Sequence, residues 1–305
     1  MTGERLPVEV SHLSKRFGTV TAIHDLSFTV EPGTVTGFLG PNGAGKTTTL
    51  RALTGLVTPT AGTATIGGLA YRHLPRPSRT VGAVLDNVAF HPGHTARDHL
   101  RVYAAMGGHP DRRVDDLLDR LALTPAAHRR TRTFSTGMRQ RLNLATALLG
   151  DPRVLLLDEP SNGLDPEGMS WLRQLLRDLA TDGRTILVSS HVLSELETLA
   201  EHVVVIRRGE LVAAGPWAQL TGPPVVVVRT PDADALRTAL ADTHVEHEGP
   251  DRLRVHGLDT PTVADVAARH RLRVHELTTE HTSLEQLFLR LTTDQPTHTG
   301  QAPTP

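Results

Sequence analysis

A glycine-rich loop that ends in lysine and threonine is the stretch of the sequence best suited to chemistry. Residues 40–47 read Gly-Pro-Asn-Gly-Ala-Gly-Lys-Thr, and a helix is expected to begin near Lys46. The glycines allow backbone N–H groups to point inward at phosphate oxygens, and the helix N-terminus adds its positive dipole end. Lys46 would pair with the β- and γ-phosphates of a nucleotide, and the Thr47 hydroxyl would bind Mg²⁺. The residues predicted to bind nucleotide here are Gly40, Pro41, Asn42, Gly43, Ala44, Gly45, Lys46, Thr47 and Thr48.

Two adjacent carboxylates form a second candidate for chemistry. Asp158 and Glu159 follow the apolar run at 154–157, so they are expected at the carboxyl end of a buried strand, where open α/β sheets bind ligands. Asp158 would hold Mg²⁺ through its water shell, and Glu159 would polarise the attacking water as a weak general base. Without the glycine-rich loop, a solvated turn would be the favoured interpretation of this pair.

These residues require a parallel sheet to bring them together. The continuous apolar strand at 34–39 runs into the glycine-rich loop, and the apolar runs at 154–157 and 185–188 are typical of strands covered on both faces. Residues 8–30 are expected to form antiparallel strands, and residues from about 86 to 150 are mainly helical in their apolar spacing. The pattern predicts an α/β fold interrupted by a helical insert.

A change of composition divides the chain near residue 222. The Thr-Gly-Pro-Pro punctuation at 221–224 marks the end of a first domain, 1–222. Residues 223–292 are expected to form a small α+β accessory domain, in the order β-α-β-α-β-α, and the Thr- and Pro-rich residues 293–305 a disordered tail. The elements expected in the accessory domain lie at 225–229, 233–241, 252–256, 263–270, 272–277 and 283–291.

The composition excludes several classes of function. The 33 acidic and 32 basic residues nearly cancel, so no overall field attracts the chain to nucleic acid or to an anionic bilayer. The sequence contains no cysteine, which excludes disulfides, thiolate zinc sites and thiol catalysis. No apolar run approaches the roughly 20 residues that span a bilayer. We therefore expect a cytoplasmic chain, peripheral on the inner face of the cell membrane, that reaches the membrane through a specific partner.

Three further segments carry a resemblance to a known family. Residues 134–141, Phe-Ser-Thr-Gly-Met-Arg-Gln-Arg, resemble the signature sequence of the ABC (ATP-binding cassette) transporters. Residues 161–165 look like the family's D-loop, and residues 189–191 look like the segment that carries its switch histidine. The motifs occur in the family's order and the resemblance covers residues 5 to about 220. It implies a P-loop NTPase fold with a RecA-like core, an antiparallel β subdomain and a helical subdomain at about 86–150.

The resemblance also indicates a subfamily. Residues 162–166, Asn-Gly-Leu-Asp-Pro, and the segment Ser-Leu-Glu-Gln-Leu-Phe-Leu at 283–289 look most like the stand-alone cassettes of ABC-2 exporters. These include pumps for antibiotic self-resistance and lantibiotic immunity. The function implied is an ATP-binding and ATP-hydrolysing subunit, with ATP and Mg²⁺ as cofactors.

The resemblance assigns roles that spacing alone does not. Ser135 and Gly137 would contact the γ-phosphate bound by the opposite subunit, and Asp165 would join the residues around the nucleotide. His191 would hydrogen-bond the γ-phosphate and sense its loss, although a lone histidine at a strand end is more often structural. Phe17 would stack on adenine, the alternative being a core phenylalanine. An ordinary helix cap at Ser135 is compatible with its proposed role.

Departures from the family pattern bear on the same site. Asp86 stands where the family usually has glutamine, and we expect it to act as a catalytic and Mg²⁺-binding residue that also affects coupling. Its carboxylate adds negative charge beside the triphosphate. Thr136 and Met138 replace the usual glycine and glutamine of the signature, and Thr136 would crowd the nucleotide if its φ were positive.

The expected machine is a pair of cassettes on a permease. Two copies of this chain, or this chain and a paralogue, would sandwich each ATP, closing when it binds and opening after hydrolysis. The partner is a separate integral membrane permease, and no nucleic acid is expected. The alternatives are a soluble ABC ATPase acting on the ribosome or DNA, which usually has a second cassette or a coiled-coil insert, and a non-catalytic cassette. Intact Lys46, Asp158, Glu159 and His191 argue against the latter.

Overall fold

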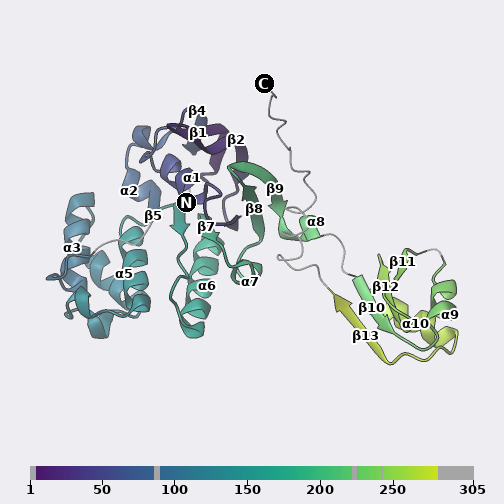
Figure 1. Cartoon of the computed structure of the whole chain (residues 1–305). Helices are drawn as coiled ribbons and strands as arrows, with labels where there is room; N and C mark the ends of the chain where they lie inside the picture. Colours follow the sequence, from purple (N-terminus) through teal and green to yellow (C-terminus); the bar gives the residue numbers. More distant parts are fainter. Residues whose placement is uncertain (1–4, 86–89, 222–224, 242, 281–305) are drawn as a thin grey trace, which may run out of the picture. The chain divides into compact units, whose positions relative to one another are not determined.

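The computed structural model describes residues 5–85, 90–221, 225–241 and 243–280. The chain forms two compact units, Met1–Gly215 and Pro216–Pro305, which are described separately below (Figure 1). The predicted domain boundary at 222 lies outside the described residues. So do Asp86, the helix expected at 283–291 and the tail expected at 293–305.

A six-stranded sheet forms the centre of the first unit (Figure 1). Its strand order is β5-β6-β7-β3-β8-β9, and the pairs from β5 to β8 are parallel. The continuous apolar runs of the sequence form β3, β6 and β7, which are buried along their whole length, as a sheet covered on both faces requires. The α/β fold is therefore confirmed. The strands are β5 (Val81–Val84), β6 (Val154–Asp158), β7 (Thr185–Ser190), β3 (Val35–Leu39), β8 (His202–Arg207) and β9 (Glu210–Pro216).

An antiparallel sheet packs over the central one. It contains β2 (Val20–Val30), β1 (Val8–Phe17) and β4 (Ala61–Ile66), in that order. Helix α1 (Lys46–Leu53), which follows the glycine-rich loop, contributes Leu50 and Leu53 to the core between the two sheets. Burial of such a leucine side chain contributes about 1.5–3 kcal/mol, so this core holds the loop that precedes α1 in place.

The helical insert consists mainly of α3 (Ala96–Gly107), α4 (Arg112–Arg120) and α5 (Thr136–Leu148). Helix α5 packs against β5 and against the other two helices. Local signals define both ends of α3. At its start, the Thr95 hydroxyl accepts a hydrogen bond from the Asp98 N–H at 3.1 Å, and the Asp98 carboxylate accepts one from the Thr95 N–H, which forms a capping box. At its end, Gly108 has a left-handed backbone conformation. The short α2 (Pro77–Thr80), α6 (Pro166–Thr181) and α7 (Leu193–Glu197) complete the unit.

One buried histidine makes the helical insert sensitive to acid. His99 of α3 is 4% exposed, and its Nε2 atom lies 3.1 Å from the Thr146 hydroxyl of α5. Burial, assisted by the charge of His94, lowers the pKa of His99 to about 4, below the ordinary 6.5. The unfolded chain therefore binds the extra proton first, and the stability contributed by neutral His99 is lost as pH falls from about 6.5 through about 4.

We expect the free energy of unfolding of wild type to fall by up to roughly 3 kcal/mol more than that of His99→Gln over this pH range. Urea unfolding at several pH values measures the difference. Equal pH dependence of wild type and variant would show that His99 is not the responsible group.

The second unit contains a four-stranded antiparallel sheet with order β11-β12-β10-β13. Helices α9 (Ala233–Ala239) and α10 (Thr260–Arg269) share a core with one of its faces. The strands are β11 (Val245–His247), β12 (Arg252–His256), β10 (Val225–Arg229) and β13 (Glu276–Glu280), and α8 (Trp217–Thr221) precedes them. Within the described residues, no helix has the length and apolar character needed to cross a bilayer.

Two predictions for the second unit were wrong in detail. The last strand was expected at 272–277 but lies at 276–280, because Leu272 and Val274 pack on the core from the connection before it. Strand β11 was not expected. It is a three-residue edge strand in which Val245 alone is apolar, so it lacks the alternation that reveals a strand.

Candidate active site

The glycine-rich loop joins β3 to α1 and lines a groove of about 240 Å³. Gly43 and Gly45 have φ angles of 79° and 108°, in the region that side chains disfavour. A Cβ atom on Gly45 would lie 2.8 Å from the Ala22 carbonyl oxygen, and one on Gly40 would lie 2.6 Å from that of Ile206. Glycine is therefore required at these positions for the loop to take this shape.

Lys46 is the buried cation of the groove. It is the first residue of α1, is 6% exposed, and its Nζ atom donates to the Gly40 carbonyl oxygen at 2.6 Å. The same atom lies 3.7 Å from Glu159 Oε1. The ammonium is therefore held between the loop and the carboxylate, in a position to pair with a phosphate bound in the groove.

The oxygen atoms that could hold a magnesium ion lie together. The Thr47 hydroxyl donates to Asp158 Oδ2 at 2.6 Å, and the Ser189 hydroxyl donates to Asp158 Oδ1. A hydroxyl and a carboxylate are hard oxygen ligands of the kind that Mg²⁺ prefers. The donor atoms of these residues fit Mg²⁺, and we predict that Thr47 would bind the ion directly and Asp158 through water.

Glu159 lies at the centre of the site in a strained backbone conformation. Its φ angle is 49°, which is uncommon for a residue with a side chain and is often found at functional sites. Its N–H donates to the Ser189 hydroxyl at 3.0 Å, and its Oε2 atom lies 2.7 Å from His191 Nδ1. Strand β7 pairs in parallel with β6 on one side and with β3 on the other, which brings the carboxyl ends of the three strands to one edge of the sheet. Glu159 and His191 therefore meet beside Lys46.

The residues predicted from the family resemblance, other than His191, make their described contacts away from the groove. Ser135 and Asp165 cap α5 and α6, where their side chains accept from the Met138 N–H at 3.3 Å and the Gly168 N–H at 2.8 Å. Gly137 lies in the first turn of α5. Their nucleotide contacts remain a prediction. Phe17 is 50% exposed at the end of β1, so the alternative of a core phenylalanine is wrong.

Thr136 does not meet the condition for crowding the nucleotide. It is the first residue of α5 and its φ angle is not positive. Its side chain instead packs against Gly163, where a Cβ atom would lie 2.6 Å from the threonine methyl group. The signature segment and the D-loop segment are therefore in direct contact within one chain.

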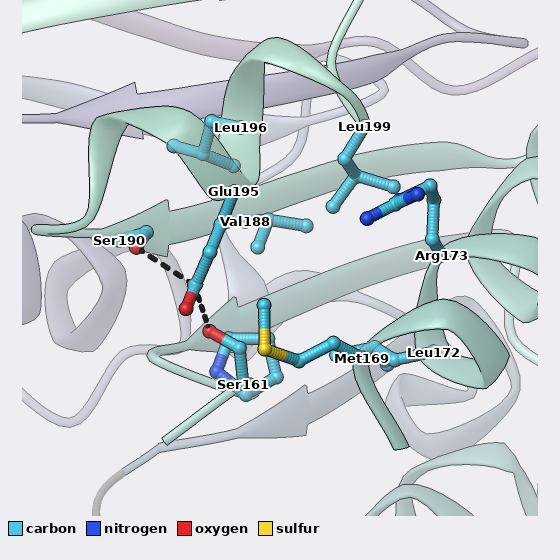
Figure 2. A pocket seen from close by; sticks show the side chains of 10 residues that line it. Ser161, Met169, Leu172, Arg173, Val188, Ser190, Glu195, Leu196 and Leu199 are labelled. Carbon is cyan, nitrogen blue, oxygen red and sulfur yellow. Dashed lines mark hydrogen bonds between the residues drawn. The ribbon is translucent and has the colours of Figure 1, made fainter. Parts of the chain in front are cut away.

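One supporting residue was missed by sequence reasoning. Glu195 of α7 accepts a hydrogen bond from the Ser161 hydroxyl and lies 3.5 Å from the Ser190 hydroxyl (Figure 2). Met169 and Val188 line the small cavity of about 30 Å³ beside it. Glu195 thus links the segment after Glu159 to the end of β7. A single acid in a helix carries no spacing signal that could have identified it.

Replacing Glu195 by alanine is expected to lower ATP turnover several-fold and to leave ATP affinity within about two-fold, because Ser161 loses its acceptor while the phosphate loop is untouched. Steady-state hydrolysis and nucleotide titration separate the two effects. Glu201→Gln, at an exposed residue before β8, is the control. A large loss of affinity in Glu195→Ala would show that Glu195 supports the phosphate loop instead.

Two segments of the chain match known protein families. Residues 23–162 match the ABC transporter family, and residues 224–285 match a domain of unknown function. The first match contains the glycine-rich loop, the signature segment and the acidic pair, and the second covers most of the second unit.

Relatives extend over nearly the whole chain. The Nod factor export ATP-binding protein I of Ralstonia nicotianae is 37% identical over 300 residues, which cover 93% of each chain. The bacitracin transport ATP-binding protein of Bacillus licheniformis is 39% identical over 216 residues, 70% of this chain and 71% of that protein. A dimeric ATP-binding cassette bound to ADP and Pi has a TM-score of 0.63 at 23% identity, covering 69% of this chain and 99% of its own.

Proposed function

The chain belongs to the ABC transporter family of ATP-binding proteins, and from that premise we propose that it powers an exporter by closing and reopening as a dimer on a separate membrane permease. It binds and hydrolyses ATP. The relatives named above are described as acting in Nod factor export and bacitracin transport. The name of the Nod factor protein supports export as the direction of transport, and the permease would determine the molecule carried.

The observation that carries the proposed mechanism is the cluster of Lys46, Glu159 and His191 beside the phosphate loop. Glu159 would orient a water molecule and accept its proton as the water oxygen attacks the γ-phosphorus and the bond to the β-phosphate oxygen breaks. Lys46 would balance the charge on the phosphates, and His191 would hold the Glu159 carboxylate in position. Thr47 and Asp158 would hold Mg²⁺, which would supply further charge compensation for the triphosphate.

Helix α5 supports a dimeric mechanism. Ser135 caps its N-terminus, and the N–H groups of the first turn, including that of Gly137, would provide an anion site. We propose that this end contacts the γ-phosphate held by the opposite copy, in a two-fold arrangement that buries both nucleotides. Phe17, Asp165 and Asp86 would contribute as the family resemblance implies. Loss of the γ-phosphate would remove the attraction between the copies and reopen the dimer.

A groove beside the helical insert is the proposed docking surface for the permease. It has a volume of about 460 Å³, lies between β5 and the helices α3 and α5, and is lined in part by Tyr103 and Met106. Met106 is 78% exposed and shares α3 with Val102 and Tyr103, which are 43% and 39% exposed, and neighbouring exposed apolar side chains are typical of an interaction surface. A short helix of the permease seated there would move with the helical insert, and the chain would be peripheral on the inner face of the membrane.

The proposal is tested by purifying the chain from membranes of the cell that makes it. We expect one integral membrane protein to co-purify, and we expect Met106→Glu to reduce its recovery without changing ATP binding. Firm binding to ribosomes or DNA at physiological salt, with no membrane partner, would favour the soluble ATPase instead.

A further inference from the structure

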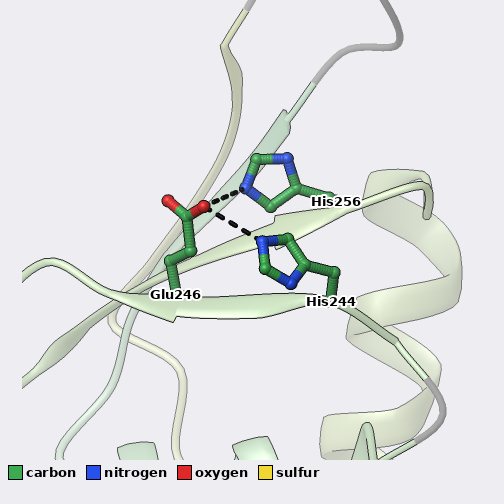
Figure 3. Close-up of side chains that lie close together, drawn as sticks. All are labelled: His244, Glu246 and His256. Atoms are coloured by element: carbon green, nitrogen blue, oxygen red, sulfur yellow. Dashed lines mark hydrogen bonds and ion pairs between the residues drawn. The ribbon is translucent and has the colours of Figure 1, made fainter.

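Three side chains on the sheet of the second unit converge on one point. His244, Glu246 and His256 have their ligand atoms within 4.8 Å of one another, and they are the only such group of three histidine, cysteine or acidic residues among those that the structure describes. Figure 3 shows both imidazole rings directed at the carboxylate. None of these residues belongs to the nucleotide site.

Antiparallel pairing explains why the three side chains share a face. Val245 pairs with Val255, and the His256 N–H donates to the His244 carbonyl oxygen at 3.0 Å, which places the two histidines side by side. Val255 is fully buried in the core shared with α9 and α10. Its neighbour His256 therefore faces away from that core, as do His244 and Glu246, because alternate residues of a strand point to opposite faces.

The spacing of the three ligand atoms matches a metal site. Glu246 Oε1 lies 3.0 Å from His244 Nε2 and 3.5 Å from His256 Nε2. Two ligands bound at about 2.0–2.1 Å to a tetrahedral zinc ion lie roughly 3.3 Å apart. A dication could therefore enter between these atoms with side-chain adjustments alone.

His256 supplies the observation that an ordinary surface cluster does not explain. Its Nε2 atom is shielded from solvent and makes no hydrogen bond, since the Glu246 oxygen at 3.5 Å is too far away or poorly aligned for one. A nitrogen that is shielded from solvent and makes no hydrogen bond is destabilising, and coordination of a cation would remove that cost. Surface pairs such as His244 and Glu246 contribute little by themselves.

The surrounding charges do not oppose a cation. Arg254 pairs with Glu246 across the strands and so shares this face. Its guanidinium lies 3.3 Å from Glu248 and 2.9 Å from Glu280. Both carboxylates also pair with Arg252, so the two arginines and the two carboxylates compensate one another. The charge of Glu246 remains available to a metal.

We propose that His244, Glu246 and His256 bind a zinc-class dication on the second unit, with two imidazoles and one carboxylate as ligands and a fourth position open to water or to a partner's side chain. Such ligands suit Zn²⁺, Co²⁺ and Ni²⁺ better than Mg²⁺ or Ca²⁺. Binding would fasten the three-residue edge strand β11 to β12. The second unit would thereby respond to metal independently of ATP.

The test uses the full chain, freed of metal by a chelator and titrated with Zn²⁺ by calorimetry and with Co²⁺ by visible absorption. We expect wild type to bind one more equivalent than His256→Ala or Glu246→Gln, and to give the absorption of tetrahedral Co²⁺, which both variants lose. His275→Ala, at an exposed histidine of the same unit, is the control and should bind as wild type does. Zn²⁺ should also raise the Tm of wild type but not of the two variants.

The two variants remove different ligands, and both replaced side chains face away from the core, so circular dichroism should show both folded. Equal stoichiometry and affinity in wild type, His256→Ala and Glu246→Gln would overturn the proposal, because the metal would then be bound by other histidines. Absence of Zn²⁺ binding to wild type would overturn it as well.

Discussion

Glu159→Gln is expected to reduce ATP turnover at least about 100-fold while ATP affinity stays within a few-fold, since a positioned general base contributes typically 10²–10⁴ to a rate. Glutamine keeps the size of the side chain and an oxygen that can accept a hydrogen bond, but it cannot accept the proton of the attacking water. Lys46 and Thr47, which would bind the phosphates, are unchanged, so binding should survive. Single-turnover hydrolysis and a fluorescent-nucleotide titration measure the two quantities.

The control is again Glu201→Gln, because Glu201 is exposed and precedes β8, at the end of the parallel strands opposite the site. It should hydrolyse ATP at the wild-type rate. A Glu159→Gln protein with wild-type turnover would remove Glu159 from the mechanism, and its hydrogen bond to His191 would then have only a structural role.

Lys46→Ala is expected to impair ATP binding itself, and to weaken ATP affinity by about 10- to 100-fold. A hydrogen bond to a charged group contributes about 1.5–3 kcal/mol, and each 1.4 kcal/mol corresponds to a tenfold change in affinity. The buried ammonium also hydrogen-bonds the Gly40 carbonyl oxygen, so the variant loses a contact within the loop itself. Nucleotide titration by calorimetry, with the Tm recorded for each protein, measures the change.

Arg112→Ala serves as the matched loss of positive charge, because Arg112 is an exposed residue of α4. It should bind ATP as wild type does. Unchanged affinity in a folded Lys46→Ala protein would contradict the assignment of the loop as the triphosphate site.

The parts of the fold that sequence predicted well have local signals. Strands β3, β6 and β7 are covered on both faces, so their residues form unbroken apolar runs that a reader can identify without knowing their neighbours. The loop before α1 carries its own pattern, because glycine is the residue that tolerates its φ angles. The convergence of Lys46, Glu159 and His191 then follows from parallel pairing.

The parts that sequence missed depend on contacts between distant segments. Glu195 accepts a hydrogen bond from Ser161, which lies 34 residues away in the sequence, and no local pattern in either segment predicts this contact. His244 and His256 become neighbours only through the register of β11 and β12, and β11 itself is too short and polar to be recognised. The error in the position of β13 has the same origin, because Leu272 is apolar like a strand residue but packs on the core from the connection before the strand.

The molecular mass of Glu159→Gln, measured by light scattering with and without Mg-ATP, tests the central claim most directly. That claim is that ATP joins two cassettes through the phosphate loop of one and Ser135 and Gly137 of the other. Removing the carboxylate lessens its repulsion with the γ-phosphate, so the closed state should accumulate. We predict a dimer at saturating ATP, a monomer without nucleotide, and a monomer with ATP when Ser135 is also replaced by arginine. A Glu159→Gln protein that stays monomeric at saturating ATP would contradict the account.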